Sequence, residues 1–292
     1  MNLEKLTTET PNQKTKNLGA MSPLEVCKAM NDEDKNVPLA IEKVLPQIAK
    51  AIEIIANQFN EGGRLIYSGA GTSGRLGLLD AVECVPTFGT PDSQVIGLIA
   101  GGQKAFIKAV EGAEDSTEFG AQDLKDIDFN KKDVLVGIAA SGRTPYVLGA
   151  LEYANSIGAQ TIAVSCNLNS EIGAAAKLAI EIDAGSEVLT GSTRLKAGTA
   201  QKLILNMLST GSMVQIGKVY GNLMVDVLMT NKKLENRARR IIMLATGVDF
   251  EKADKALIAA GNKPKTAIVM ILNNVNRQEA ERILQNNKGF IK

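Results

Sequence analysis

The sequence predicts an α/β fold with a doubly wound parallel sheet of about five strands, N-terminal helices and a small C-terminal helical domain. Two observations lead to this prediction. Short apolar runs alternate with helical stretches through the middle of the chain, as expected of parallel strands that helices cover on both faces. After residue 234 the helical pattern continues, but no strand-like run appears.

The first sixty residues predict helices that follow a polar arm. Residues 1–20 are rich in Thr, Asn and Lys and predict an extended arm. Ser22-Pro-Leu-Glu25 is a capping box with proline at the first helical position, so a helix is expected to begin there. From Val37 onward, apolar residues recur with the helical period, and Pro46 is expected to kink this second helix.

Strand-like and helical segments then alternate. The expected strands lie at 65–67, 95–99, 134–138, 161–164 and 178–182. The expected helices between and after them lie at 74–84, 103–110, 114–125, 145–156 and 196–215. Four shorter helices are expected at 237–245, 250–260, 264–273 and 277–285. We therefore expect two domains, one over residues 1–235 and a small helical one over residues 236–292.

Composition narrows the possible functions. The 292 residues carry a net charge of +1 and no long basic run, which argues against binding to nucleic acid or to an anionic membrane. No segment reaches transmembrane length and the start has no apolar signal core, so we expect a soluble cytoplasmic protein. The chain has no histidine, and its three cysteines have no metal or redox spacing. Acid–base chemistry must therefore fall on Glu, Asp, Lys, Tyr or Cys.

The turn after the first expected strand is a candidate anion site. Its sequence is Ser68-Gly-Ala-Gly-Thr-Ser-Gly74, and its glycines allow a tight turn that lies close to a ligand. The free N–H groups at the start of the following helix favour an anion, and Ser68, Thr72 and Ser73 add hydroxyl groups.

A second turn of the same kind, Ala140-Ser-Gly-Arg-Thr-Pro145, follows the third expected strand. Ligands of parallel sheets bind beyond the carboxyl ends of the strands, so the two turns are expected to surround one compact anion such as a phosphomonoester. The simpler interpretation is that glycine and serine merely form tight connections, and it explains one such turn better than two.

A dinucleotide is the rival ligand. Gly69, Gly71 and Gly74 match the G-x-G-x-x-G pattern, which is weak by itself. The dinucleotide fingerprint also requires an acid at the end of the second strand, and this strand runs into Ile99-Ala-Gly-Gly-Gln103. A phosphorylated small molecule is therefore favoured over a nucleotide, and the absence of Gly-Lys-Ser/Thr excludes a P-loop.

Further polar residues could complete the site. The stretch Glu187 to Lys202 enters a helix through Gly, Ser and Thr, and Arg194 and Lys196 offer more anion contacts. A capped helix with solvated cations explains that stretch equally well. Glu83 and Glu114 could approach a bound sugar, although spacing alone does not distinguish them from other acids nearby.

Six motifs together indicate a family. They are Ser68-Gly-Ala-Gly-Thr-Ser-Gly-Arg75, Asp80-Ala-Val-Glu-Cys-Val-Pro-Thr-Phe-Gly89, Glu111-Gly-Ala-Glu-Asp-Ser116, Ala140-Ser-Gly-Arg-Thr-Pro-Tyr-Val147, Leu189-Thr-Gly-Ser-Thr-Arg-Leu-Lys-Ala-Gly-Thr-Ala-Gln-Lys202 and Val219-Tyr-Gly-Asn-Leu-Met-Val-Asp226. In these motifs, and over nearly its whole length, the chain resembles the N-acetylmuramic acid 6-phosphate etherases. These are sugar-isomerase (SIS) domain proteins related to glucokinase regulatory protein.

The resemblance implies a lyase reaction that serves the recycling of cell-wall amino sugars. The lactyl ether of N-acetylmuramic acid 6-phosphate is cleaved by elimination and water addition, giving N-acetylglucosamine 6-phosphate and D-lactate. The family mechanism needs no metal and no other cofactor. By the resemblance, Glu83 is the acid that protonates the departing lactate and Glu114 is the base that removes the C2 proton.

The resemblance also suggests the binding residues and the assembly. The expected substrate contacts are Ser68, Gly71, Thr72, Ser73, Ser141, Gly142, Thr144, Ser192, Arg194 and Lys196. A homodimer is expected, and the C-terminal helices are similar to ubiquitin-associated (UBA) modules. Two other functions stay open: a non-catalytic sugar-phosphate sensor, which needs the turns but not the acids, and an aldose–ketose isomerase.

Overall fold

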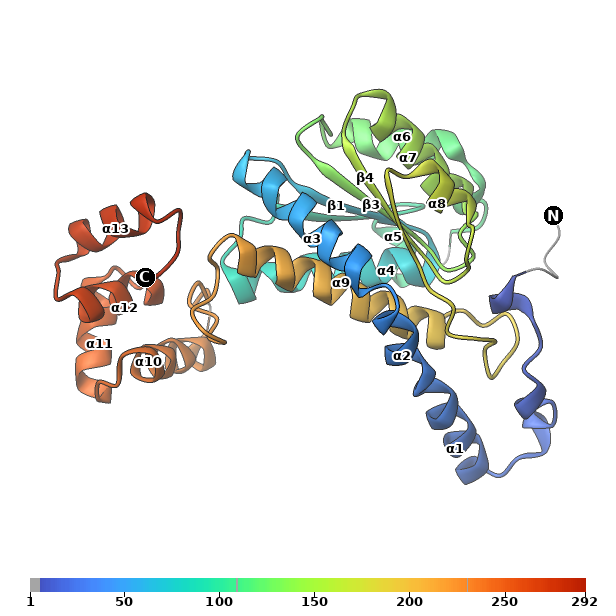
Figure 1. Cartoon of the computed structure of the whole chain (residues 1–292), viewed down its shortest axis with the longest axis horizontal. Helices are drawn as coiled ribbons and strands as arrows, with labels where there is room; N and C mark the ends of the chain where they lie inside the picture. Colours follow the sequence, from blue (N-terminus) through green and yellow to red (C-terminus); the bar gives the residue numbers. More distant parts are fainter. Residues whose placement is uncertain (1–5, 109, 230) are drawn as a thin grey trace. The chain divides into compact units, whose positions relative to one another are not determined.

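The central feature of the computed structural model is a five-stranded parallel sheet with the strand order β2-β1-β3-β4-β5 (Figure 1). The structure describes residues 6–108, 110–229 and 231–292. The strands are β1 (Leu65–Gly69), β2 (Val95–Ile99), β3 (Val134–Ala139), β4 (Gln160–Ser165) and β5 (Leu178–Glu181). All five were predicted from the sequence to within two residues, and the predicted fold class is confirmed.

Strand β1 lies inside the sheet and pairs in parallel with β2 on one side and with β3 on the other. Gly69, its last residue, is level with Ile99 of β2 and Ile138 of β3. The chain thus leaves β1 toward one edge and later returns to its other side. The boundary between β1 and β3 is the switch point at which open parallel sheets bind ligands.

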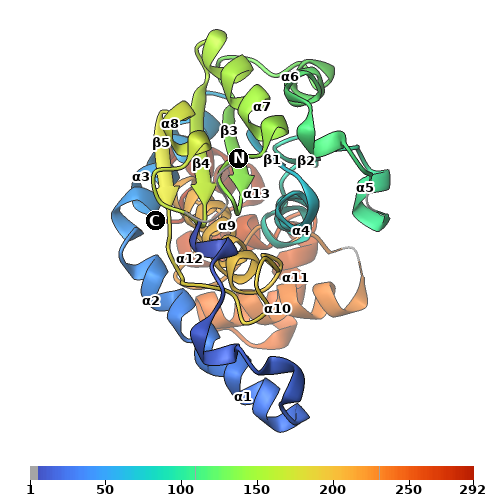
Figure 2. The ribbon, with the colours of Figure 1, turned by 90° about the vertical axis from the view of Figure 1, so that its right-hand side faces the viewer.

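Helices cover both faces of the sheet. Among the described residues up to 215, the α-helices are α1 (Pro23–Asp34), α2 (Asn36–Glu42), α3 (Leu45–Asn60), α4 (Gly71–Phe88), α5 (Lys104–Ile107), α6 (Thr117–Asp126), α7 (Pro145–Ser156), α8 (Glu171–Ala175) and α9 (Lys196–Gln215). Helices α6 and α7 lie side by side in both views (Figures 1 and 2).

Alternate residues of the strands pack against different helices. Ile66 and Leu135 belong to a buried cluster that includes Leu124 of α6 and Val147 of α7. On the other face, Gly77 of α4 lies so close to β1 that a Cβ atom added to it would be 2.8 Å from the Cβ of Tyr67. Each face of β1 is therefore sealed by a different helix, as expected of a doubly wound sheet.

The N-terminal arm is not extended as predicted. Its described part, residues 6–20, forms three short 3-10 turns, Thr7–Glu9, Gln13–Thr15 and Leu18–Ala20. Local side-chain bonds favour these turns, because Asn12 accepts a hydrogen bond from the N–H of Lys14. The first five residues of the predicted arm, and residue 109 in the predicted helix 103–110, lie outside the described residues.

Proline breaks the second predicted helix instead of kinking it. Helix α2 ends at Glu42, and α3 begins at Leu45 with Pro46 in its first turn. Proline has no N–H to donate inside a helix, but the first turn does not require that donor. A break before Pro46 therefore costs less than a kink through it.

The chain divides into two compact units. The first comprises Met1–Ala81 and Val95–Ser209, and the second comprises Val82–Gln94 and Thr210–Lys292. The second unit thus takes in residues 82–94 and 210–235, which the sequence-based division placed in the first domain. Independent folding of residues 236–292 stays a prediction.

Four further helices form most of the second unit. They are α10 (Lys232–Thr246), α11 (Phe250–Ala259), α12 (Pro264–Asn273) and α13 (Arg277–Asn286). Their buried core includes Ile242, Leu257 and Ile268, and Val225 and Val227 of the preceding segment join it. The four predicted helices are confirmed, although α10 begins five residues earlier than expected.

Candidate active site

The first turn brings the start of α4 directly against the end of β1. Gly71 has a φ of +52°, which a residue with a side chain rarely adopts, and begins the helix. A Cβ atom on Gly74 would lie 2.6 Å from the carbonyl oxygen of Gly69, so only glycine permits this approach. The first N–H groups of α4 consequently stand at the carboxyl edge of the sheet, where they favour an anion.

The second turn stands beside the first because β1 and β3 are adjacent parallel strands. Gly142 has a φ of +73°, and a Cβ atom there would lie 2.3 Å from the Cβ of Ser170. Thr144 is the N-cap of α7, but its side chain makes no capping hydrogen bond, so the hydroxyl group is available to a ligand. The structure thus places both predicted turns at one edge of the sheet.

The start of α9 joins the first turn. The hydroxyl of Ser73 donates to Oε1 of Gln201 over 2.9 Å. A Cβ atom on Gly198 would lie 3.4 Å from Cγ2 of Thr72, so the two helix N-termini are neighbours. Of the residues predicted to bind substrate in this third stretch, Ser192 is half-buried and Arg194 is exposed.

Lys196, which we expected to contact the substrate, has other partners. It is 1% exposed, and its ammonium group lies 2.7 Å from Glu33 and donates to the carbonyl of Ala184 over 3.1 Å. Its charge is therefore neutralised inside the chain, where a buried ammonium group requires a partner. Lys196 is therefore not available to contact a substrate.

Ser68 is a buried residue of β1 that directly precedes the first turn. It is fully buried at the end of β1, beneath Tyr146 of α7. The phenol of Tyr146 donates to Asp123 over 2.5 Å. Burial, reinforced by that bond, raises the pKa of Tyr146 well above its usual range. Among the described residues the hydroxyl of Ser68 has no hydrogen-bond partner, and Ser68 offers no exposed surface to a ligand.

Asp80 is a half-buried carboxyl group of α4 that the sequence did not distinguish from other acids. Tyr67 donates to one of its oxygens over 2.8 Å, and Ser209 donates to the other over 3.1 Å. Burial raises its pKa from 3.8 to about 6, although both hydrogen bonds and the charge of Lys202 act to lower it. No short-range signal marks this group, since its partners lie on β1 and α9.

The two predicted catalytic glutamates are both exposed. Glu83 lies in the second half of α4, and Glu114 lies in the 3-10 turn Ala113–Asp115 that precedes α6. Gly112, with a φ of +75°, reverses the chain just before that turn. Glu83 belongs to the second unit and Glu114 to the first, and their roles stay predictions.

Within residues 6–108, 110–229 and 231–292, no cluster of three or more His, Cys, Asp or Glu side chains is arranged to hold a metal ion. In the same part of the chain, none of the helices has the length and apolar character needed to cross a membrane.

Comparison with known proteins places the sheet in the SIS group. Residues 47–155 match the family model of the glucokinase regulatory protein N-terminal SIS domain, and residues 114–211 match the SIS domain model. A phosphoheptose isomerase structure from Francisella tularensis superposes with a TM-score of 0.53 at 18% identity, covering 66% of this chain and all of the isomerase. At that identity the likeness shows the fold alone.

Relatives of high identity match nearly the whole chain. An N-acetylmuramic acid 6-phosphate etherase of Bacillus mycoides is 58% identical over 290 residues, which is 99% of each chain. An etherase of the same name from Bacillus cereus is 59% identical over the same length. Because this similarity runs through both units, it includes the helical tail as well as the SIS sheet. The chain therefore belongs to the N-acetylmuramic acid 6-phosphate etherase family.

Proposed function

We propose that this protein is an enzyme that cleaves the D-lactyl ether of N-acetylmuramic acid 6-phosphate, releasing D-lactate and N-acetylglucosamine 6-phosphate. The observation that carries the proposal is the 58% identity to a named etherase over 99% of both chains. Two donor-rich turns that follow the neighbouring strands β1 and β3, with the start of α9 beside the first turn, support the proposal. The reaction would serve the recycling of cell-wall amino sugars.

The 6-phosphate is proposed to bind where the turns meet. The free N–H groups at the start of α4 and the unused hydroxyl of Thr144 are the donors that the geometry supports best. Gly71, Thr72, Ser73, Ser141, Gly142, Ser192 and Arg194 complete the proposed contacts. Ser68 is proposed to position the first turn, because it is fully buried.

The proposed chemistry consists of proton transfers around an elimination. In the open sugar, the C1 aldehyde acidifies the C2 proton, which Glu114 removes. The C3–O bond then breaks, and lactate leaves with a proton from Glu83. Water adds to the resulting alkene, with oxygen at C3 and hydrogen at C2. None of these steps transfers an electron pair to or from a redox carrier, and two carboxyl groups of opposite protonation state suffice.

An assay for D-lactate tests the proposal directly. Folded, full-length protein mixed with N-acetylmuramic acid 6-phosphate should release one D-lactate for each sugar consumed. Binding of the sugar phosphate without lactate release would instead support the non-catalytic sensor. Conversion of an aldose phosphate to a ketose phosphate, again without lactate, would support the isomerase.

We further propose a homodimer in the cytoplasm. Ile107 of α5 is 91% exposed, and Phe106 and Val110 beside it are also exposed. An apolar cluster of this kind is typical of a surface that a partner covers. Cys27, Cys84 and Cys166 form no disulfide, which is typical of a reducing compartment.

A further inference from the structure

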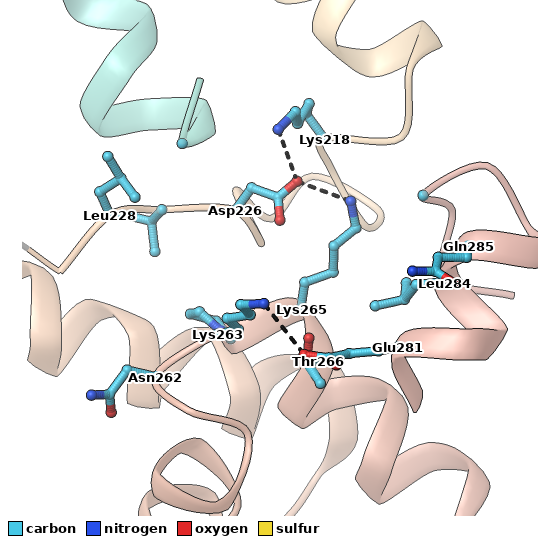
Figure 3. Close-up of a pocket in the computed structure, with 14 residues that line it drawn as sticks. Lys218, Asp226, Leu228, Asn262, Lys263, Lys265, Thr266, Glu281, Leu284 and Gln285 are labelled. Carbon is cyan, nitrogen blue, oxygen red and sulfur yellow. Dashed lines mark hydrogen bonds and ion pairs between the residues drawn. The ribbon is translucent and has the colours of Figure 1, made fainter. Parts of the chain in front are cut away.

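The second unit contains a cavity that the proposed reaction does not use (Figure 3). Its volume is about 550 Å³, within the range of small-molecule sites. Its walls come from the segment around Asp226, from the start of α12 and from α13. It therefore lies entirely within the unit that comprises Val82–Gln94 and Thr210–Lys292.

The charged side chains in this cavity are unequal in number. Lys218 and Lys265 both approach Asp226, at 3.6 Å and 2.9 Å, and Lys263 lies 3.3 Å from Glu281. Three ammonium groups thus face two carboxylates, and two of the three share one carboxylate (Figure 3). One positive charge is left in excess, in a partly desolvated place where it attracts an anion.

Helix α12 begins at this cavity without a side-chain cap. Asn231, Asp249 and Asn276 cap the other three helices of the unit, whereas Lys263, the N-cap of α12, makes no capping hydrogen bond. The N–H groups of the first helical turn have no acceptor within the helix. The dipole of this ten-residue helix adds to the attraction for an anion.

Thr266 provides a further donor that the fold does not use. It is 3% exposed and lines the cavity, yet its hydroxyl takes part in none of the side-chain hydrogen bonds found among the described residues. This hydroxyl can therefore donate to a ligand in the cavity without breaking a bond of the fold. The hydroxyl, the free N–H groups at the start of α12 and the ammonium groups of Lys218 and Lys265 thus all belong to residues that line this one cavity.

We propose that this cavity is a second anion site, which binds a phosphate group. A tetrahedral dianion can accept hydrogen bonds from several directions, as this set of donors requires, and lysine binds phosphate as a point charge. Asp226 acts as an internal anion that occupies both lysines when no ligand is bound. This proposal is independent of the etherase reaction, since no residue of the cavity belongs to the proposed substrate contacts.

The test measures phosphate binding by the full-length protein, using its thermal unfolding in phosphate-free buffer. Inorganic phosphate is titrated against sodium chloride at matched ionic strength, in a background that carries Ser141→Ala and Thr144→Val to weaken the SIS turns. N-acetylglucosamine 6-phosphate is titrated in parallel, which distinguishes free phosphate from a phosphomonoester as the ligand. We expect saturable stabilisation that persists in this background.

Variants with opposite expected effects make the test specific. Asp226→Asn removes the competing carboxylate and should tighten binding about two- to fivefold, and Lys218→Met should weaken it by a similar factor. Thr266→Val keeps the shape of the side chain and should weaken binding about fivefold. Lys255→Met, which removes an exposed lysine paired with Glu251 outside the cavity, should leave binding unchanged.

Two results would overturn the proposal. One is the loss of all phosphate-dependent stabilisation in the Ser141→Ala/Thr144→Val background, which would assign every bound phosphate to the SIS turns. The other is a folded Asp226→Asn variant that binds phosphate no more tightly, which would make the lysine cluster a purely structural ion pair. D-lactate release, measured on the cavity variants in the unmodified background, reports separately on the proposed function.

Discussion

Two buried tyrosines hold carboxyl groups on opposite faces of the strand that enters the first turn. Tyr67 donates to Asp80 of α4, and Tyr146 of α7 donates to Asp123 of α6. Burial raises the pKa of both carboxyl groups above the usual value. The turn is thus fixed from two sides by groups that need not contact a ligand themselves.

Asp80 should make the stability of the protein depend on pH. Its folded pKa of about 6 exceeds its ordinary value of 3.8, so the folded chain keeps a proton that the unfolded chain loses. The resulting stabilisation is complete below about pH 4 and is lost as the pH rises to about 6, so ionised Asp80 destabilises the fold at neutral pH. Asp80→Asn should therefore raise the free energy of unfolding at pH 8 by about 2 kcal/mol and have little effect at pH 4.

Urea unfolding at several pH values measures this difference. Asp92→Asn, a change at an exposed carboxyl group, serves as the control for net charge. An Asp80→Asn variant that is less stable than the parent protein at pH 8 would show that the charged form of Asp80 is favoured in the fold, contrary to the expectation.

Substitutions of Glu83 and Glu114 should differ in their effect on exchange of the C2 proton with solvent. If Glu114 removes the C2 proton, Glu114→Gln should abolish both lactate release and exchange of that proton with deuterated solvent. Glu83→Gln should abolish lactate release yet still permit exchange, because the first proton transfer does not need the acid. Each loss should be at least about a hundredfold, as is typical of general acid–base catalysis. Equal exchange rates in the two variants would refute the division of roles.

The sequence predicts the environment of a single residue only where the residues that contact it are close in the chain. The glycines of the turns follow from backbone geometry, and Gly71 and Gly142 do have positive φ values. Lys196 could not be placed, because the carboxylate that neutralises it, Glu33, is distant in the chain. For the same reason the sequence could not distinguish Asp80 from other acids, because its partner Ser209 lies on another helix.

The close packing of the second turn, which connects β3 to α7, can be tested by a substitution at Gly142. Gly142→Ala introduces a Cβ atom 2.3 Å from that of Ser170 and also strains a φ of +73°. We expect it to lower the free energy of unfolding by about 2–4 kcal/mol. Gly158→Ala is the matched control, because Gly158 has a φ of +83° with nothing within 4 Å, and it should cost only about 1 kcal/mol.

Urea denaturation of both variants provides the comparison. If they were destabilised equally, the strain of the positive φ would explain the whole effect and the close packing against Ser170 would contribute nothing.

The strands and most helix boundaries were predictable because their signals are local. Helices α7, α9 and α12 begin and end at the predicted residues. Helix α4 was predicted too short at both ends: it begins at Gly71 and continues through Pro86 to Phe88. Glycine and proline usually interrupt helices, so local preference alone predicted α4 too short.

At the scale of the whole molecule, the proposed homodimer can be tested by sedimentation. The full-length protein should sediment with twice the mass of one chain. Ile107→Glu, which places a charge on the exposed apolar cluster of α5, should shift the distribution toward the single chain. A parent protein that stays a single chain at micromolar concentration would contradict the proposal.

The division of the chain into units was the hardest feature to predict. The sequence changes character near residue 234, but the second unit also takes in residues 82–94, which include the end of α4. Leu228 donates its N–H to the carbonyl of Pro86, a contact within this unit that joins distant parts of the chain. Periodicity describes one segment at a time and cannot show such a pairing.

The N-terminal arm is held by an ion pair and by buried hydrogen bonds, which should respond differently to salt and to urea. Lys14 of the arm shares Glu33 with Lys196, but Lys14 is 78% exposed, so its ion pair contributes little. The arm is held mainly by buried hydrogen bonds, one from Thr15 to the carbonyl of Val188 and another between Thr8 and Asn167. Mild urea should therefore release it more readily than concentrated salt does, and amide hydrogen exchange in residues 6–20 would report that early, local opening.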